Sequence, residues 1–279
     1  MPRWGTVEEC REVVNADMKK IPDSLKIFDE ESRNDPERNP WRKMVVGIVT
    51  CAKNKRRYDN FMEIFGDIFK QIGLEYYIIS ADLDIVPDDP SDDFVIDHES
   101  RVFTAKAFEA YENLAHKLAI FYSWVYNHTD YDYVIKADDG CLLNLHAVIT
   151  KLDLDYVGSI LKPTSNRCHI NKCKQDKYNK VDLDFKHDFD LIKDRSGKQA
   201  IPDSKIKELY DVRAAGGGYG YRLSRNALRN VDRYKSHILS VGLSYEDIIF
   251  GQVMFLEGIT PVGHWIGRYH AIGPNIGGK

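Results

Sequence analysis

Hydrophobic positions between residues 44 and 160 alternate between two kinds of pattern. Short apolar runs bounded by polar or turn-forming residues predict buried β-strands at 44–50, 76–80, 133–138 and 156–160. Apolar residues spaced three and four apart predict amphipathic helices over 61–72 and 108–125. Strands that alternate with helices in this way indicate an α/β fold with a mostly parallel central sheet flanked by helices.

Residues 1–43 precede this alternation and predict an N-terminal helical arm. Helical spacing relates Val7, Cys10, Val14 and Met18, and Thr6 with Glu9 has the spacing of a capping box. A second short helix is expected to hold Leu25, Ile27 and Phe28, and the proline-containing segment 34–40 ends it. We expect the arm to pack on the domain and to offer a homodimer contact.

The remaining segments predict surface loops around one glycine-rich turn. Residues 82–97 are acidic and contain proline, which indicates a surface loop. Residues 162–212 are rich in lysine and aspartate, and we expect a long excursion that lies over the site. Three glycines at 216–218 allow backbone to approach a ligand closely, while Tyr219 and Tyr221 offer aromatic faces. Ser224 is placed to cap the next helix.

Composition and charge narrow the class of protein. The chain has 279 residues, a hydrophobic share of 43% and a net charge of −4, which disfavours a broad nucleic-acid surface. The apolar run at 44–52 is far too short to span a membrane, and because the first residues lack an apolar stretch we expect no signal peptide. Five scattered cysteines favour a reducing compartment, and Cys168 with Cys173 lacks the second pair that zinc sites use. We therefore expect a soluble, cytoplasmic protein.

Candidate chemistry gathers where the predicted strands end. The largely apolar run that begins at Tyr133 is followed by Asp138, Asp139 and Gly140. Acids that follow a parallel strand lie at the carboxyl edge of the sheet, where α/β proteins bind ligands. Paired carboxylates suit a divalent cation that carries phosphate oxygens, although an Asp-Gly turn without chemical function has the same sequence. Basic residues follow the first strand and suit a phosphate or nucleotide, or form a solvated turn: Lys53, Arg56 and Arg57. The chain has no dinucleotide-binding glycine fingerprint after that strand.

Four stretches in order resemble glycosyltransferase family 31, which includes β-1,3-galactosyltransferases, β-1,3-N-acetylglucosaminyltransferases and Fringe-like enzymes. They are Tyr111-Glu-Asn-Leu-Ala-His-Lys117, Tyr133-Val-Ile-Lys-Ala-Asp-Asp139, Gly216-Gly-Gly-Tyr-Gly-Tyr-Arg-Leu-Ser224 and Glu246-Asp-Ile-Ile-Phe-Gly251. The family patterns read roughly Tyr-x-Asn-Leu-x-x-Lys, Lys-x-Asp-Asp-Asp, Gly-Gly-x-Gly-Tyr-x-Leu-Ser and Glu-Asp-Val-x-x-Gly. The resemblance implies a single GT-A domain over residues 44–270, with a short tail at 271–279, and inverting transfer from a UDP-sugar.

The resemblance also implies roles for individual residues. The uridine and phosphates would lie against Thr50 and the basic loop through Arg57, with Lys117 and the glycines Gly217 and Gly218 near the donor. Asp138 and Asp139 form the Asp-x-Asp region, which contacts the donor and a manganese ion. Asp247 is the implied catalytic base, with Glu246 as an orienting residue or acceptor ligand. His270 would complete the metal site, and His264 is the competing choice.

One position departs from the family pattern. Gly140 stands where the family has a third aspartate, which is the usual metal ligand. Either Asp139 or Asp138 takes over as the ligand, or the metal is bound weakly, or the cations of the basic loop replace it. A non-catalytic carbohydrate- or UDP-binding protein and a glycoside hydrolase remain as alternatives. The transferred sugar could be galactose, N-acetylglucosamine, glucose or xylose, and the acceptor a glycan or glycoprotein.

Overall fold

A computed structural model describes residues 6–26, 28–50, 55–109, 113–161, 212–240 and 246–269. The strands are β1 (Met44–Val49), β2 (Glu75–Ala81), β3 (Phe94–Asp97), β4 (Val102–Ala105), β5 (Tyr133–Asp138), β6 (Cys141–Leu143), β7 (Tyr156–Gly158), β8 (Tyr221–Ser224), β9 (Val262–Gly263) and β10 (Gly267–Tyr269). The α-helices are α1 (Val7–Met18), α2 (Glu30–Asn34), α3 (Lys55–Ile72), α4 (Leu114–His128), α5 (Leu145–Val148), α8 (Arg225–Arg233), α9 (Lys235–Ser240) and α10 (Glu246–Leu256). Short 3₁₀ turns are η1 (Asp23–Leu25), η2 (Pro40–Lys43) and η8 (Gly217–Tyr219).

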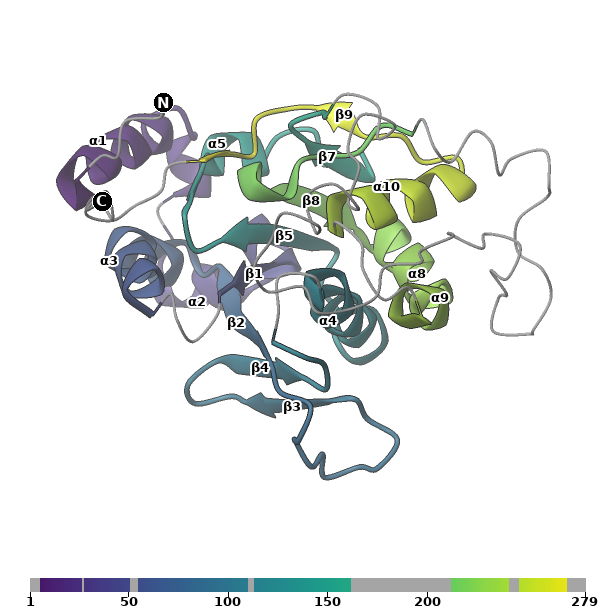
Figure 1. The fold of residues 1–279 in the computed structure, drawn as a ribbon. Helices are drawn as coiled ribbons and strands as arrows, with labels where there is room; N and C mark the ends of the chain where they lie inside the picture. The colour runs from purple at the N-terminus through teal and green to yellow at the C-terminus, as the bar shows by residue number, and fades with distance from the viewer. Residues whose placement is uncertain are drawn as a thin grey trace, which may run out of the picture.

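An eight-stranded mixed sheet forms the middle layer of the described structure, in the order β3-β4-β2-β1-β5-β8-β7-β9 (Figure 1). β1 pairs in parallel with both β2 and β5, and β2 pairs in parallel with β4. β8 enters the sheet antiparallel to β5, and β3 is antiparallel to β4 at one edge. The predicted α/β class is confirmed, and the strands expected near residues 44, 76, 133 and 156 are all present.

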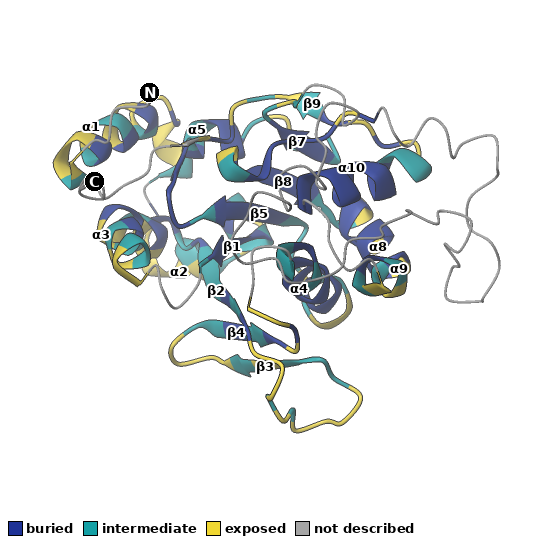
Figure 2. Ribbon diagram, in the orientation of Figure 1, coloured by how far each residue is buried: buried dark blue, intermediate teal, exposed yellow. Residues whose placement is uncertain are grey.

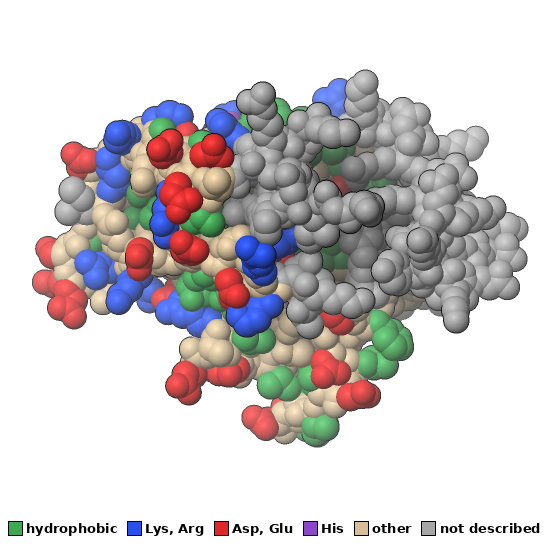
Figure 3. All heavy atoms as spheres, turned by 60° about the vertical axis from the view of Figure 1, so that its left-hand side comes forward, with side chains coloured by type: hydrophobic (Ala, Val, Ile, Leu, Met, Phe, Trp, Pro, Cys, Tyr) green, Lys and Arg blue, Asp and Glu red, His purple; other side chains and the backbone are tan. Residues whose placement is uncertain are grey.

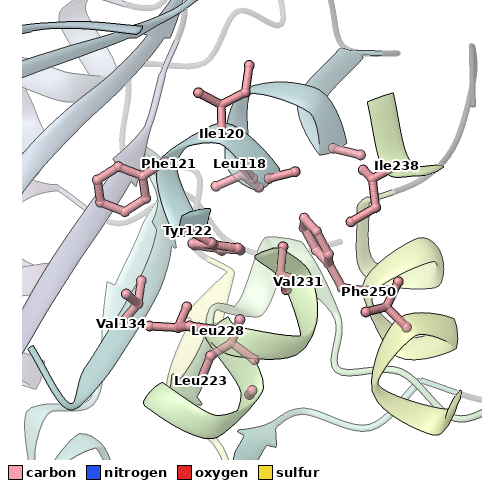
Figure 4. Packing of buried hydrophobic residues seen from close by; sticks show 14 of the residues in the cluster. Leu118, Ile120, Phe121, Tyr122, Val134, Leu223, Leu228, Val231, Ile238 and Phe250 are labelled. Carbon is pink, nitrogen blue, oxygen red and sulfur yellow. The ribbon is translucent and has the colours of Figure 1, made fainter. Parts of the chain in front are cut away.

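One face of the sheet packs against α4, α8, α9 and α10 (Figure 4). Phe121 of α4 packs against Phe103 of the sheet, Tyr122 packs against Phe250 of α10, and both residues of α4 are fully buried. Gly47 of β1 makes this packing possible, since an added Cβ would lie 2.7 Å from Ile79 Cδ1 and 2.8 Å from Phe121 Cε1. β1 is therefore covered closely enough that a glycine is required in its middle.

The opposite face packs against α1, α3 and α5, which gives the domain its third layer. The predicted capping box at Thr6 and Glu9 starts α1, and Gly73 with φ +74° follows the end of α3. Trp41 is fully buried here, and its indole Nε1 donates to the Leu25 carbonyl at 2.8 Å. Residues of the N-terminal arm thus share a hydrophobic core with the sheet, as the buried positions in Figure 2 indicate.

Four sequence expectations need correction. The helix expected around Leu25 is the turn η1, followed by α2, which starts at residue 30 because Asp29 caps it. The acidic segment 82–97 ends in the strand β3, which pairs with the unpredicted β4. Phe108 lies before α4 and is 62% exposed, so it is no part of that helix's buried side. The apolar pattern after the acids predicts a short helix from Leu145 to Leu152, but α5 ends at Val148.

The described surface carries charges of both signs. Lys and Arg side chains lie among Asp and Glu side chains over the described part of the face in Figure 3. No described helix has the length and apolar character needed to cross a membrane. Such an interspersed surface offers no broad basic area for nucleic acid on this face.

Candidate functional site

The predicted donor residues meet at the edge where β1 and β5 end side by side. The register pairs Val49 with Asp138, so the residues after the two strands are neighbours. The Asp139 amide donates to the Val49 carbonyl at 3.1 Å, and the Thr50 hydroxyl donates to Asp139 Oδ2 at 2.9 Å. The parallel pairing therefore brings two sequence-predicted donor residues, Thr50 and Asp139, into direct contact.

A buried lysine joins these acids to the predicted catalytic pair. Lys136 is 1% exposed, and its Nζ lies 2.5 Å from Asp138 Oδ1 and 2.9 Å from Glu246 Oε1. It also donates to the Gly217 carbonyl at 2.8 Å. Because side chains alternate along a strand, Lys136 and Asp138 share one face of β5. The contacts of the Lys136 ammonium group thus connect β5, the glycine-rich turn and the first residue of α10.

The glycine-rich turn lies against the two acids that open α10. A Cβ on Gly217 would stand 1.9 Å from Glu246 Oε1, so a side chain at this position would displace the Glu246 carboxylate. The Gly217 amide donates to Asp247 Oδ2 at 3.4 Å, and Gly218 follows it within η8. Gly220 has φ +71°, and a Cβ there would lie 2.8 Å from the Lys136 carbonyl. The three glycines predict a turn whose backbone approaches a ligand closely. In the structure, the missing side chain of Gly217 makes room for the Glu246 carboxylate.

Two acids of the site, Glu246 and Asp139, have raised pKa values. Burial raises the pKa of Glu246 to about 7, with Lys136 opposing this shift and the charges of Asp247 and Asp138 adding to it. Burial also raises the pKa of Asp139 to about 6, against the Thr50 hydrogen bond and the attraction of Arg57 and Lys117. Burial alone would lower the pKa of Lys136, but the neighbouring carboxylates outweigh it and raise the value. Shifted acids gathered at one sheet edge are typical of functional sites.

The predicted donor-binding cations differ in their surroundings, since Lys117 is paired with protein groups and Arg56 and Arg57 lie at the start of a helix. Lys117 is buried, and its Nζ donates to the Thr50 carbonyl at 2.9 Å and to Glu109 Oε1 at 2.7 Å. The other Glu109 oxygen accepts from the Ala81 amide at 2.7 Å, so this ion pair braces the ends of β1 and β2. Arg56 and Arg57 lie in the first turn of α3 and not in the predicted loop. The positive charge of Arg57 favours the ionised form of Asp139. Lys53 is outside the described residues.

His264, one of the two predicted histidine ligands, lies against Thr150 and not among the acids of the site. His264 Nε2 lies 3.1 Å from the Thr150 hydroxyl, and burial with Lys151, Arg222 and His146 lowers its pKa. Cationic neighbours make this a poor place for a metal ion. His270 lies outside the described residues, although the preceding Tyr269 pairs with Cys141, just after the acids. Within the described ranges, no three His, Cys, Asp or Glu side chains form a group that could hold a metal.

Two features of the site were not assigned from the sequence. Lys136 lies within the motif at 133–139 but has no implied role there, and Glu109 lies outside the four motifs. Tyr221, expected to offer an aromatic face, is fully buried, and its hydroxyl accepts from Tyr122 at 3.0 Å. Tyr219 is 37% exposed and remains the aromatic face of the turn.

Replacing Gly217 tests how tightly the turn holds the acids. Gly217→Ala places a methyl group on Glu246, which must move away from Lys136, so we expect a loss of about 1–3 kcal/mol in unfolding free energy. Urea denaturation measures this loss. Gly66→Ala in α3 is the matched control, because its Cβ would meet only Met62 Cε at 3.4 Å. That control should gain up to about 1 kcal/mol from helix propensity, and equal stability of the two variants would contradict the packing described.

In comparisons with known proteins, no family model matches this chain and no curated relative matches it. The site is therefore interpreted from its own geometry and from the motifs that it contains.

Proposed function

We propose that this chain is an inverting glycosyltransferase that moves a sugar from a UDP-sugar to a hydroxyl of a glycan acceptor and forms a β-linkage. The observation that carries the proposal is the bridge from Lys136 to Asp138 and Glu246. It joins acids suited to a nucleotide donor and acids suited to general-base catalysis within one site. A GT-A arrangement of the sheet agrees with the motif order and belongs to the same proposal.

The donor end is built for an anionic group. α3 begins with Lys55, Arg56 and Arg57, and a helix N-terminus favours negative charge. Arg57 lies close enough to Asp139 for its charge to oppose the rise in pKa that burial causes, so this basic turn faces the acidic strand end. The diphosphate of a UDP-sugar would lie between the basic helix start and the carboxylates. Lys117 contributes by holding the Thr50 backbone in place rather than by binding phosphate itself.

Asp138 and Asp139 are the residues that would hold Mn²⁺ or Mg²⁺ brought in with the diphosphate. With the described residues they use one oxygen each, Asp138 Oδ1 toward Lys136 and Asp139 Oδ2 toward Thr50. Mg²⁺ commonly takes one or two carboxylates plus substrate phosphates, so a pair of carboxylates fits without a third acid at Gly140. When bound, the cation would stabilise the negative charge that develops on the departing UDP.

The acceptor end uses the start of α10. The acceptor oxygen forms a bond to the anomeric carbon while the bond from that carbon to the diphosphate breaks, and UDP leaves with the bonding electrons. Asp247 takes the proton of the acceptor hydroxyl, which makes the oxygen a better nucleophile. Glu246 is fixed by Lys136 and Gly217, so its task is to orient this end of the site. Attack opposite to the leaving group inverts the anomeric centre.

Nucleotide binding and donor turnover test the proposal directly. Calorimetry should detect UDP binding, and a screen of UDP-galactose, UDP-N-acetylglucosamine, UDP-glucose and UDP-xylose should reveal UDP release from at least one. EDTA followed by Mn²⁺ should remove and then restore the release. No binding at saturating UDP would overturn the proposal. Binding without turnover would favour a non-catalytic UDP-binding protein, and sugar release from glycosides without a nucleotide would indicate a hydrolase.

A further inference from the structure

Two exposed aromatic rings form a corner beside the candidate site. Tyr219 and Trp265 are 37% and 59% exposed, their ring centroids are 5.8 Å apart, and their planes meet at 88°. Large exposed hydrophobic side chains are few in the described structure. Four of them lie in the segment 83–108, and Ile160 lies against Gly263, close in sequence to Trp265. The pair of Tyr219 and Trp265 is therefore distinct from the exposed apolar side chains of segment 83–108, and it lies beside the glycine-rich turn η8.

Both rings stand on backbone that is held in place. Trp265 lies between His264, whose amide donates to the Gly158 carbonyl at 3.0 Å, and the fully buried Ile266. The Ile266 carbonyl accepts from Asn144 at 2.8 Å, which ties this segment to the end of β6. The Tyr219 amide donates to the Gly216 carbonyl at 3.2 Å within η8. The two exposed rings are therefore carried by backbone segments that hydrogen bonds and a buried neighbour hold in place.

The corner lies near the acids of the acceptor end. Tyr219 is two residues from Gly217, a span of at most about 7 Å of extended chain. Gly217 contacts Glu246, Asp247 and Lys136. A Cβ on Gly267 would lie 2.7 Å from the Tyr219 carbonyl, so the segment that carries Trp265 also packs against this turn. Backbone contacts therefore connect both rings to the glycine that seats the acids.

We propose that Tyr219 and Trp265 form a binding subsite for a pyranose ring of the acceptor glycan. A pyranose has a C–H face that packs on an aromatic ring and hydroxyls at its rim, and tyrosine and tryptophan suit such amphipathic partners. Two perpendicular rings can contact one face and one edge of the same sugar. This inference rests on the proposed function, because it assigns the subsite to the side of Asp247, where the acceptor hydroxyl must lie. The nucleotide lies instead toward Thr50 and Arg57.

Tryptophan fluorescence measures this binding without nucleotide or turnover. Of the four tryptophans in the sequence, Trp41 is fully buried and Trp124 is 7% exposed, while Trp4 lies outside the described residues. Titration with lactose, cellobiose and chitobiose at millimolar concentration should shift the emission and protect it from acrylamide quenching. Trp265→Ala should abolish the response and weaken binding of the responding disaccharide about tenfold. Trp265→Phe should lose the signal but keep most of the affinity in a calorimetric titration.

Controls separate this inference from the proposed function. Val86→Ala removes an exposed apolar side chain on the β2–β3 segment and should leave the response unchanged. UDP affinity should be the same in Trp265→Ala and the parent chain. If both Trp265→Ala and Tyr219→Ala bind the disaccharides as the parent does, or if UDP alone causes the fluorescence shift, the glycan subsite is overturned. Failure of UDP-sugar turnover with an intact glycan response would count against the transferase alone.

Discussion

Lys136→Met is expected to lower the unfolding free energy by about 3–5 kcal/mol near neutral pH. Methionine has nearly the length of lysine, so the main loss is the charge between Glu246 and Asp138. Removing one partner of a buried ion pair leaves the other charge uncompensated, and this is the reason for the large cost. Glu246 is 5% exposed and cannot regain solvation by a small movement. Urea denaturation of the variant and the parent chain measures the difference.

The pH dependence identifies the charge as the cause. Glu246 has a folded-state pKa of about 7, above its ordinary 4.5, so stability falls as pH rises through this interval. Without Lys136 the folded pKa of Glu246 rises further, and the fall continues to higher pH. The raised pKa of Lys136 keeps it charged throughout this range. Relative to the parent chain, the variant should therefore lose much less stability near pH 4.5, where Glu246 is protonated and Asp138 alone faces the missing ammonium, than near pH 8.

A double substitution completes this test. Lys136→Met with Glu246→Gln replaces the ion pair by two uncharged side chains of similar volume, which commonly costs little. We expect the double variant to recover most of the stability lost in Lys136→Met, and the double-mutant cycle gives the coupling of the pair. Equal destabilisation at both pH values, or additive losses in the cycle, would mean that packing rather than charge is responsible.

The strand ends could be predicted from the sequence because local patterns determine them. The apolar runs before Thr50 and Asp138 define strands of known direction, and parallel pairing then makes their ends neighbours. Glu246 and Asp247 precede a largely apolar segment, a pattern that predicts a helix start, and both lie in the first turn of α10. Adjacent motifs could thus be assigned to one sheet edge before their contacts were known.

Partnerships between distant residues could not be predicted in this way. Lys136 interrupts an apolar strand, and nothing nearby in the sequence indicates that its charge is compensated by Glu246 and the Gly217 carbonyl, the latter 81 residues away. Glu109 lies within the segment 108–125 that was predicted as a helix, but α4 begins only at Leu114, and nothing near Glu109 in the sequence indicates that it pairs with Lys117. β3 and β4 were missed for a similar reason, since each has only four residues and gains its stability from pairing.

Asp247→Asn is expected to reduce sugar transfer by about 10²–10⁴-fold, which is the usual contribution of a general base. Asparagine has the shape of aspartate and can still accept the hydrogen bond from the Gly217 amide, so the turn should keep its position. UDP affinity should be nearly unchanged, because the proposed donor residues Thr50, Asp138 and Asp139 lie at the ends of β1 and β5. Initial rates at saturating donor, together with calorimetry of UDP binding, separate the two effects.

Glu246→Gln is the matched variant that assigns the base to one member of the adjacent pair. Glu246 is held by Lys136 Nζ at 2.9 Å and lies against Gly217, so its substitution should disturb orientation and stability together. Asp247→Asn should instead lose rate while its unfolding curve stays close to that of the parent chain. If Asp247→Asn turns over normally and Glu246→Gln is the inactive variant with unchanged stability, the base is Glu246 and the roles are reversed. A loss of UDP affinity in Asp247→Asn equal to its loss of rate would place Asp247 on the donor instead of the acceptor.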